Sequence, residues 1–190
     1  MNEKRAIQLC VEHRDPIGFE FLVEKYRREA HMHAYALLGN VDDAAEACQE
    51  SFSSAFSSMS RLGELTAFYP WFYRILRNRC LNVLSRARTA AAHARLERMG
   101  AAETSASTEA EAIRKEASEQ VWAALGTLKL EHREILALKF LRGYDYQTLA
   151  SLIGIPRGTV MSRLYHARRA FRDAYLNQSE TPTTGDRNHG

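Results

Sequence analysis

The stretch YQTLASLIGIPRGTVMSRLYHARRAFR, residues 146–172, contains two helical patterns separated by a Gly-Ile-Pro break. Gly154 stands where the chain must turn and a Cβ would be costly. Pro156 suits the start of the second helix because its missing N–H leaves no bond unmade there. One face of that helix is apolar, with Val160, Leu164, Ala167 and Phe171 at helical spacing. The pattern predicts a helix-turn-helix, whose second helix enters the DNA major groove.

The opposite face of that second helix is polar and basic. Between Arg157 and Arg172 the sequence has five arginines and no acidic residue, whereas a face that only meets solvent usually mixes the two signs. Side chains of these types can hydrogen-bond base edges and pair with phosphate oxygens. We therefore predict that this face binds DNA, with Ser162, Tyr165, His166 and Arg169 at its centre and Arg157, Met161, Arg163 and Arg172 beside them.

Length and composition limit the classes of protein to which this chain can belong. Its 190 residues, of which 45% are hydrophobic, can bury one medium core or two small ones, so global disorder is not expected. The formal net charge is only +3, and acidic and basic residues are segregated along the chain. No apolar run approaches the roughly 20 residues of a transmembrane helix. Because residues 1–15 also lack the apolar stretch of a secretory signal, we expect a cytoplasmic protein without membrane insertion.

The sequence contains no pattern typical of catalysis or of a bound cofactor. Its three cysteines are widely spaced and form neither a disulfide framework nor a Cys-x-x-Cys motif: they are Cys10, Cys48 and Cys80. Cys48 falls on an apolar helical face and is most simply a small buried hydrophobe. Cys10 with His13, and His31 with His33, suggest a metal site, but no four-ligand spacing closes. We therefore predict no enzyme, no cofactor and no metal.

The first block of the chain, from about residue 3 to residue 88, has helical periodicity throughout. After a break at Gly39-Asn40, Asp42 or Asp43 can cap a helix over about Asp43–Met59. Its apolar face has Cys48, Phe52, Ala55, Phe56 and Met59. Its other face is polar and acidic without a basic residue, with Asp42, Glu46, Gln49, Glu50 and Ser53. The residues alone explain that face equally well as a solvated surface and as a docking surface for a basic partner.

The next helix, predicted over about Ala67–Arg88, combines aromatic residues with arginines and has no acidic residue. Such a combination favours single-stranded nucleic acid, because exposed bases stack on rings while the backbone attracts positive charge. Phe68, Trp71 and Ile75 share one face and are expected mainly in the core. The remaining aromatic side chains are expected to project away from it, as candidates for base stacking: Tyr69, Phe72 and Tyr73.

Between the two blocks the composition changes to Ala, Ser, Thr and Glu over about residues 89–108, as is typical of a linker. Helical patterning with a second set of apolar residues resumes near Ala110. We therefore predict an all-α protein with two small helical domains joined by a flexible linker, the C-terminal one containing the helix-turn-helix. The expected boundaries are residues 1–90 for the N-terminal domain, 91–112 for the linker, 113–177 for the C-terminal domain and 178–190 for a disordered tail.

Three stretches, in this order, resemble the extracytoplasmic-function (ECF) sigma factors of bacterial RNA polymerase. DDAAEACQESFSSAF, residues 42–56, is similar to the second conserved helix of that family. FYPWFYRILRNRCLNVLSRAR, residues 68–88, is similar to its promoter melting and recognition helix. YDYQTLASLIGIPRGTVMSRLYHARRAF, residues 144–171, is similar to its second promoter domain. The resemblance covers about residues 19–175 and implies a subunit that binds core polymerase and directs promoter-specific transcription initiation.

The resemblance also implies a role for each matching position. The set that docks on the clamp coiled coil of the large polymerase subunit would be Asp43, Glu46, Gln49, Glu50 and Phe52. The loop at 61–66 would capture a flipped base of the minus-ten element, and ring contacts must offset the few kcal/mol that unstacking costs. The whole minus-ten set would be Arg61, Leu62, Glu64, Tyr69, Phe72, Tyr73, Arg77, Asn78, Asn82 and Arg86. The minus-thirty-five set would be Arg157, Thr159, Ser162, Arg163, Tyr165, His166 and Arg169.

Some positions depart from the family's pattern. Ala45 stands where an acid is common, and Asn82 where Asp is often found. Met161 and His166 stand where basic residues are frequent. Because Met161 cannot make a bidentate contact to guanine, the upstream sequence preference cannot be copied from relatives. Members of the family are commonly held inactive by an anti-sigma protein, so the resemblance implies that partner as well.

Two other functions remain open on the residues alone. A conventional helix-turn-helix regulator that does not replace sigma explains residues 154–172, but leaves the acidic face and the aromatic-basic helix without a role. A helical adaptor that binds only protein would direct its basic helices at acidic partners. Transcription with purified core polymerase separates the first alternative from a sigma factor, because only a sigma factor supports specific initiation by itself.

Overall fold

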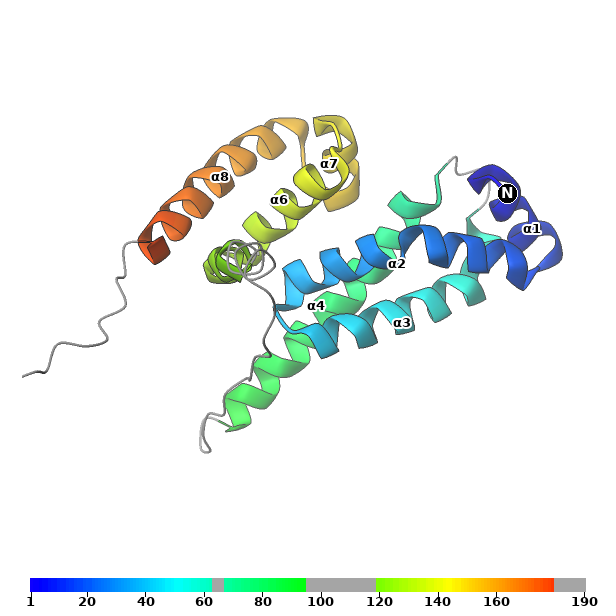
Figure 1. The fold of residues 1–190 in the computed structure, drawn as a ribbon, viewed down its shortest axis with the longest axis horizontal. Coiled ribbons are helices and arrows are strands. Elements are labelled where there is room, and N and C mark those ends of the chain that lie inside the picture. The colour runs from blue at the N-terminus through cyan, green and yellow to red at the C-terminus, as the bar shows by residue number, and fades with distance from the viewer. Residues whose placement is uncertain (63–66, 95–118, 180–190) are drawn as a thin grey trace, which may run out of the picture.

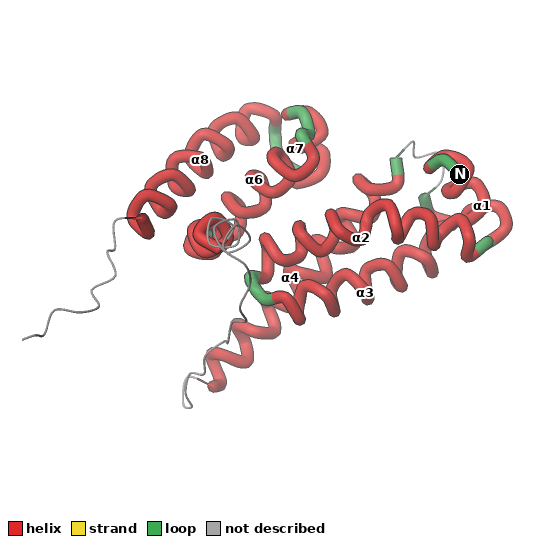
Figure 2. Tube along the Cα trace, in the orientation of Figure 1, coloured by secondary structure: helices red, strands yellow, loops and turns green. Residues whose placement is uncertain are grey.

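The computed structural model describes residues 1–62, 67–94 and 119–179, and every regular element in these ranges is helical. The elements are α1 (Glu3–His13), α2 (Pro16–Leu38), α3 (Val41–Ser58), the short 3-10 helix η1 (Met59–Arg61), α4 (Phe68–Ala94), α6 (Leu130–Arg142), α7 (Tyr146–Ile153) and α8 (Arg157–Ser179). Residues 119–127 are also helical. Figure 1 shows α1–α4 as one group and α6–α8 as another, and the tube in Figure 2 shows no strand among the described residues. The prediction of two all-α domains is confirmed.

The connection between α2 and α3 follows from two adjacent residues. Gly39 ends α2 with a left-handed φ of +72°, which a residue without a Cβ adopts at little cost. The side chain of Asn40 then accepts hydrogen bonds from the backbone N–H groups of Asp42 and Asp43 at 2.8 and 3.0 Å. The prediction that one of these aspartates caps α3 is therefore wrong. Asn40 stands one residue earlier, so the two carboxylates occupy the first turn, where they oppose the helix dipole favourably.

Aromatic rings form most of the core of the N-terminal domain. Phe52 of α3 stacks on Phe72 of α4 with 4.3 Å between ring centroids, and Phe72 stacks in turn on Phe68 at 5.4 Å. Tyr26 of α2 lies against Phe68 at 5.7 Å. Cys48 is buried nearby, which confirms that it acts as a small hydrophobe. Among the described residues no helix is long and apolar enough to cross a bilayer.

The first turns of α4 are buried on more sides than the sequence predicts. Tyr69, Phe72 and Tyr73 are at most 1% exposed, whereas Trp71 and Ile75 are only partly buried. The prediction that the first three project away from the core is therefore wrong. The physical reason is that α4 packs on α2 and α3 and also meets α7 of the other domain, so a single apolar stripe does not describe it.

The C-terminal domain contains the predicted helix-turn-helix. Asp145 caps α7 by accepting a hydrogen bond from the Thr148 N–H at 2.7 Å, and Gly154 ends α7 with a φ of +78°. The apolar residues of α8 that face this turn are buried, as expected: Val160, Leu164 and Ala167. Phe171 is partly buried. The left-handed φ at Gly154 is the structural reason for a glycine, because open space surrounds its Cα.

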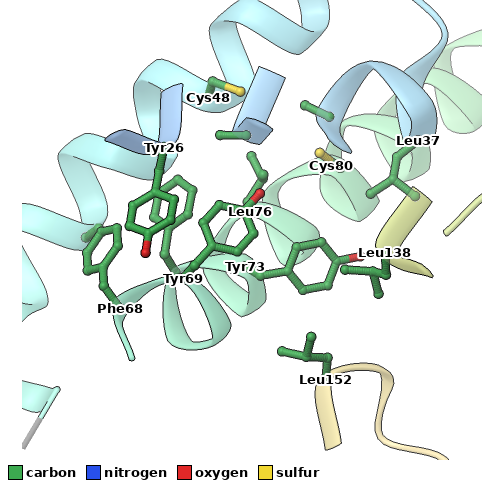
Figure 3. Packing of buried hydrophobic residues seen from close by; sticks show 14 of the residues in the cluster. Tyr26, Leu37, Cys48, Phe68, Tyr69, Tyr73, Leu76, Cys80, Leu138 and Leu152 are labelled. Carbon is green, nitrogen blue, oxygen red and sulfur yellow. The ribbon is translucent and has the colours of Figure 1, made fainter. Parts of the chain in front are cut away.

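The two domains pack against each other through buried side chains. Helix α6 lies along α2, and α7 meets the first half of α4. Figure 3 shows Tyr73 of α4 pointing toward Leu138 of α6, with Leu152 of α7 close by. The buried residues of both domains form one continuous cluster. The described parts of the chain therefore adopt a closed arrangement.

Candidate nucleic-acid and partner interfaces

The solvent-facing side of α3 carries an acidic surface, which we define by Asp42, Asp43, Glu46 and Gln49. All four are exposed. Among the described residues none of the three carboxylates in this acidic surface has an ion-pair partner, which leaves their charge available to a basic partner. Glu50, at the edge of the surface, is instead paired with Arg79 of α4 at 3.0 Å. Phe52 is 8% exposed and lies in the core, so it supports α3 from beneath and does not face a partner.

The exposed side of α8 brings together the residues predicted to bind duplex DNA. Arg157, Ser162, Tyr165, His166 and Arg169 are all exposed, and Thr159 is half-buried at the start of the helix. Arg163 is more buried than the others, and its guanidinium lies 3.4 Å from a carboxylate oxygen of Glu131 in α6. That pair would have to loosen before Arg163 contacts DNA. The predicted minus-thirty-five residues are thus all on α8, with Ser162, Tyr165, His166 and Arg169 on its exposed side and Arg157 and Arg163 at the two flanks of that side.

Two residues outside α8 extend this surface, and sequence reasoning missed them. A cleft of about 600 Å³ lies between the start of α6 and the exposed side of α8. Lys129 and His132 line it opposite Ser162, Arg163 and His166. Burial and the positive charge of Lys129 lower the pKa of His132. No local pattern in the sequence points to these residues, because only the packing of α6 on α8 brings them beside the second helix.

The middle and second half of α4 carry the exposed part of the predicted minus-ten set. Asn78, Asn82 and Arg86 are exposed and recur every four residues, so they lie along one side of the helix. Leu62 is fully buried, so it belongs to the core and does not contact DNA directly. Glu64 and the side chain of Arg61 lie outside the described residues. The structure therefore presents a polar row on α4, which we call the α4 row: Asn78, Asn82 and Arg86.

The first half of α4 is covered by the C-terminal domain. The carboxylate of Glu134 in α6 accepts a hydrogen bond from the Tyr73 hydroxyl at 3.0 Å and forms an ion pair with the Arg77 guanidinium. Tyr69 lies beneath Arg142, whose guanidinium is 5.2 Å from the ring centroid. Three residues of the predicted minus-ten set are thus in contact with another domain.

A buried histidine and a glutamate lie at the same domain junction. His33 of α2 places Nδ1 2.7 Å from the Tyr69 hydroxyl oxygen, and burial lowers the pKa of His33 to about 4. Glu29, one turn earlier, lies with a carboxylate oxygen 2.9 Å from Nε of Arg142. Burial raises the pKa of Glu29 to about 7, although Arg142 acts in the opposite direction. Both residues therefore bind protons differently in the folded and unfolded chains.

These shifts predict opposing effects of pH on stability. Above pH 6.5, His33 is neutral in both states; as pH falls toward 4, only the unfolded chain gains a proton there, so stability is lost. Glu29 behaves in reverse, because from pH 7 down to 4.5 the folded chain takes up its proton first. Because of His33, the native chain should lose about 2 kcal/mol in free energy of unfolding when the pH falls from 7 to 5. His33→Leu should lack this loss.

Urea unfolding of both chains at pH 7 and pH 5 measures this difference. Glu29→Gln is the matched control, and its shift relative to the native chain should have the opposite sign. An unchanged pH dependence in His33→Leu would contradict the assignment of a neutral, buried imidazole.

The cysteine and histidine pairs noted in the sequence do not form a larger cluster. Among the described residues no group of three metal-ligating side chains comes together.

Comparison with known proteins identifies the family. The family model for Sigma-70 region 2 matches residues 22–90, and the model for Sigma-70 region 4 matches residues 118–171. The chain is an ECF sigma factor. The region 2 match accounts for the N-terminal block that a conventional helix-turn-helix regulator would leave unexplained. Sigma factors bind core RNA polymerase and direct promoter-specific transcription initiation, and this chain has that function. As a family, sigma factors are non-catalytic initiation factors.

Curated relatives match this sigma factor over most of its length. The ECF RNA polymerase sigma-E factor of Salmonella typhimurium is 29% identical over 183 residues, covering 90% of this chain and 94% of the relative. The sigma-E factor of Escherichia coli K12 is 28% identical with the same coverage. The RNA polymerase sigma-H factor of Pseudomonas aeruginosa is 28% identical over 172 residues, covering 86% of this chain and 89% of the relative.

Two solved structures share the fold of this sigma factor. The sigma factor RpoE from Bartonella quintana, in complex with the anti-sigma factor NepR, has a TM-score of 0.69 at 18% identity and covers 83% of this chain and 96% of its own. CnrH, in complex with the cytosolic domain of CnrY, has a TM-score of 0.68 at 19% identity and covers 95% of this chain and all of its own. At these identities the likeness concerns the arrangement of helices.

Proposed function

We propose that this sigma factor uses three separate surfaces in one initiation complex. The acidic surface of α3 binds the clamp coiled coil of the large polymerase subunit. The exposed side of α8, extended by Lys129 and His132, binds the upstream minus-thirty-five duplex. The α4 row binds the melted minus-ten strand. The observation that carries this division is the segregation of charge, because Asp42, Asp43 and Glu46 of α3 are exposed with no ion-pair partner among the described residues, while α8 exposes arginines.

The proposal extends to the domain boundaries and to regulation. Residues 1–90 would contain the polymerase and minus-ten surfaces, and residues 113–177 the minus-thirty-five surface, with 91–112 as the linker and 178–190 as a tail. The chain would act in the cytoplasm, where the polymerase is, and would have no catalytic site of its own. An anti-sigma protein would hold it inactive; this is supported by the two structural neighbours, which are each bound to another protein.

Two variants of this sigma factor should separate the roles of α8 and the α4 row. Arg169→Ala removes an exposed guanidinium from α8, and Asn82→Ala removes an exposed amide from the α4 row. A promoter is first identified by overexpressing this sigma factor and sequencing the starts of the resulting transcripts. Holoenzyme binding is then measured by fluorescence anisotropy on an upstream duplex and on a downstream fork with one exposed strand. Arg169→Ala should weaken duplex binding about 10-fold and leave the fork unchanged.

Asn82→Ala should show the reverse pattern, with fork binding reduced and duplex binding retained. Lys129→Ala should weaken duplex binding at low salt and lower the slope of affinity against salt concentration by about one, as expected for one lost phosphate contact. Arg157→Ala provides a second α8 variant for comparison. Equal losses on both DNA fragments for Arg169→Ala and Asn82→Ala would contradict the division of roles.

A further inference from the structure

A buried carboxylate from the C-terminal domain occupies part of the helix that would bind melted DNA. The side chain of Glu134 is only 4% exposed, and its hydrogen-bond and ion-pair partners among the described residues, Tyr73 and Arg77, belong to α4 of the other domain. The Tyr73 hydroxyl donates to one oxygen at 3.0 Å, and Nη2 of Arg77 lies 3.3 Å from the other. The Arg77 guanidinium thus meets Glu134 through two of its nitrogens.

Other polar contacts reinforce the same junction. Arg142, at the end of α6, pairs with Glu29 and lies over the rings of Tyr26 and Tyr69, at 5.5 and 5.2 Å from their centroids. Arg74 donates to the backbone carbonyl of Ser151 at 3.3 Å, near the end of α7. The first half of α4 therefore uses Tyr69, Tyr73, Arg74 and Arg77 to hold the C-terminal domain.

The chemistry of the Glu134 contact resembles that of a nucleic-acid backbone. A carboxylate, like a phosphate, presents two anionic oxygens to a guanidinium and accepts from a hydroxyl. A strand that contacts Arg77 and Tyr73 must therefore displace Glu134. Because the desolvation of buried ion pairs offsets much of their attraction, this contact can give specificity to the closed arrangement without making it irreversible.

We propose that the C-terminal domain blocks strand binding in the free protein, with Glu134 occupying Arg77 and Tyr73 in place of DNA. Opening of the domain junction releases both side chains. The inference rests on the proposed role of α4 in binding the melted strand. DNA and Glu134 compete for the same side chains, so only the open fraction of free chains can bind single-stranded DNA. A change that weakens the Glu134 contact increases that fraction, and the apparent affinity for single-stranded DNA rises in proportion to it.

Charge reversal at Glu134 tests the closed arrangement without DNA. Glu134→Lys places two cations together at the junction, and small-angle X-ray scattering of the free chain should show a larger radius of gyration. Glu131→Lys is the matched control, because Glu131 is an exposed residue of the same helix whose ion-pair partner among the described residues, Arg163, belongs to its own domain. The double variant Glu134→Lys with Arg77→Glu should restore the compact form. Circular dichroism should show native helix content in all three chains.

The second arm measures binding of the free chain to single-stranded oligo(dT) of about 12 nucleotides, a length in the range of such sites. Glu134→Lys should bind about 10-fold tighter than the native chain, which corresponds to a native chain about 90% closed. Glu134→Gln, which keeps the shape of the side chain and removes its charge, should shift both measurements in the same direction. It replaces Glu134→Lys if the latter fails to fold.

The outcomes distinguish this inference from the proposed function. An unchanged radius of gyration in Glu134→Lys and Glu134→Gln would overturn the closed arrangement, whatever α4 binds. Opening without tighter binding to oligo(dT) would overturn the blocking role of Glu134. Failure of the proposed function is seen separately, as unaltered fork binding by the Asn82→Ala holoenzyme.

Discussion

Glu46→Lys should reduce the affinity of this sigma factor for core polymerase by about 100-fold, because reversing one charge in a complementary interface replaces attraction by repulsion. Glu46 lies in the acidic surface of α3, is exposed, and has no ion-pair partner among the described residues. The native fold therefore does not depend on it. Glu50 is less suitable, since its pairing with Arg79 at 3.0 Å would make its reversal affect the packing of α3 on α4 as well.

Fluorescence anisotropy of the labelled sigma factor against core polymerase measures this loss at physiological salt. Glu20→Lys is the matched control, because it reverses an exposed charge on α2 outside the acidic surface. The control should bind within about 2-fold of the native chain, as expected for a charge away from the interface. Core affinity that is equal in the native chain and Glu46→Lys would contradict the assignment of α3 as the docking helix.

Phe72→Ala should lower the free energy of unfolding of the N-terminal domain by about 3–5 kcal/mol, because it leaves a cavity in a packed aromatic core. Phe72 is fully buried between Phe52 and Phe68, with which it makes parallel ring contacts at 4.3 and 5.4 Å. Removal of the Phe72 ring is therefore expected to destabilise the fold. Any reduction in DNA binding by this variant would follow from unfolding.

Urea unfolding followed by circular dichroism measures the change. Phe140→Ala is the matched control, since that ring is 66% exposed and its removal should cost under about 1 kcal/mol. If Phe72→Ala retains native stability and loses only binding to single-stranded DNA, the ring stacks on bases and our account of the core is wrong.

The C-terminal domain shows what sequence can predict. Gly154 and the stripe of Val160, Leu164 and Ala167 predict a turn followed by a half-buried helix, and the structure has both. The prediction succeeds because both signals are local. A left-handed φ excludes most residue types at position 154, and the apolar stripe of α8 faces one layer of helices. The exposed side of α8 follows directly as the complement of the buried stripe.

The aromatic start of α4 shows where such reasoning fails. Phe68 is buried, as the sequence predicts, but Tyr69, Phe72 and Tyr73 are buried as well. Periodicity identifies the side of a helix that meets one layer, and here α4 lies between its own domain and helices of the second. No local pattern reports a contact such as that between Tyr73 and Glu134, which are 61 residues apart in sequence.

The same limit explains the residues that were missed or misplaced at the interfaces. Lys129 and His132 line the cleft beside the exposed side of α8 only because α6 packs on α8. Phe52 matched a docking motif, yet its side chain points into the core, because a motif records positions along a helix and not which of them face outward. Charge segregation was more informative, since carboxylates and guanidiniums without partners must face solvent or a ligand.

The most direct test of the account is transcription by purified core polymerase supplemented with this chain alone. Run-off transcripts from promoters identified by start-site sequencing should begin at the mapped positions, and Glu46→Lys and Arg169→Ala chains should each reduce their amount. Polymerase that initiates at those positions only after a second sigma factor is added would contradict the central claim that this chain itself directs promoter recognition.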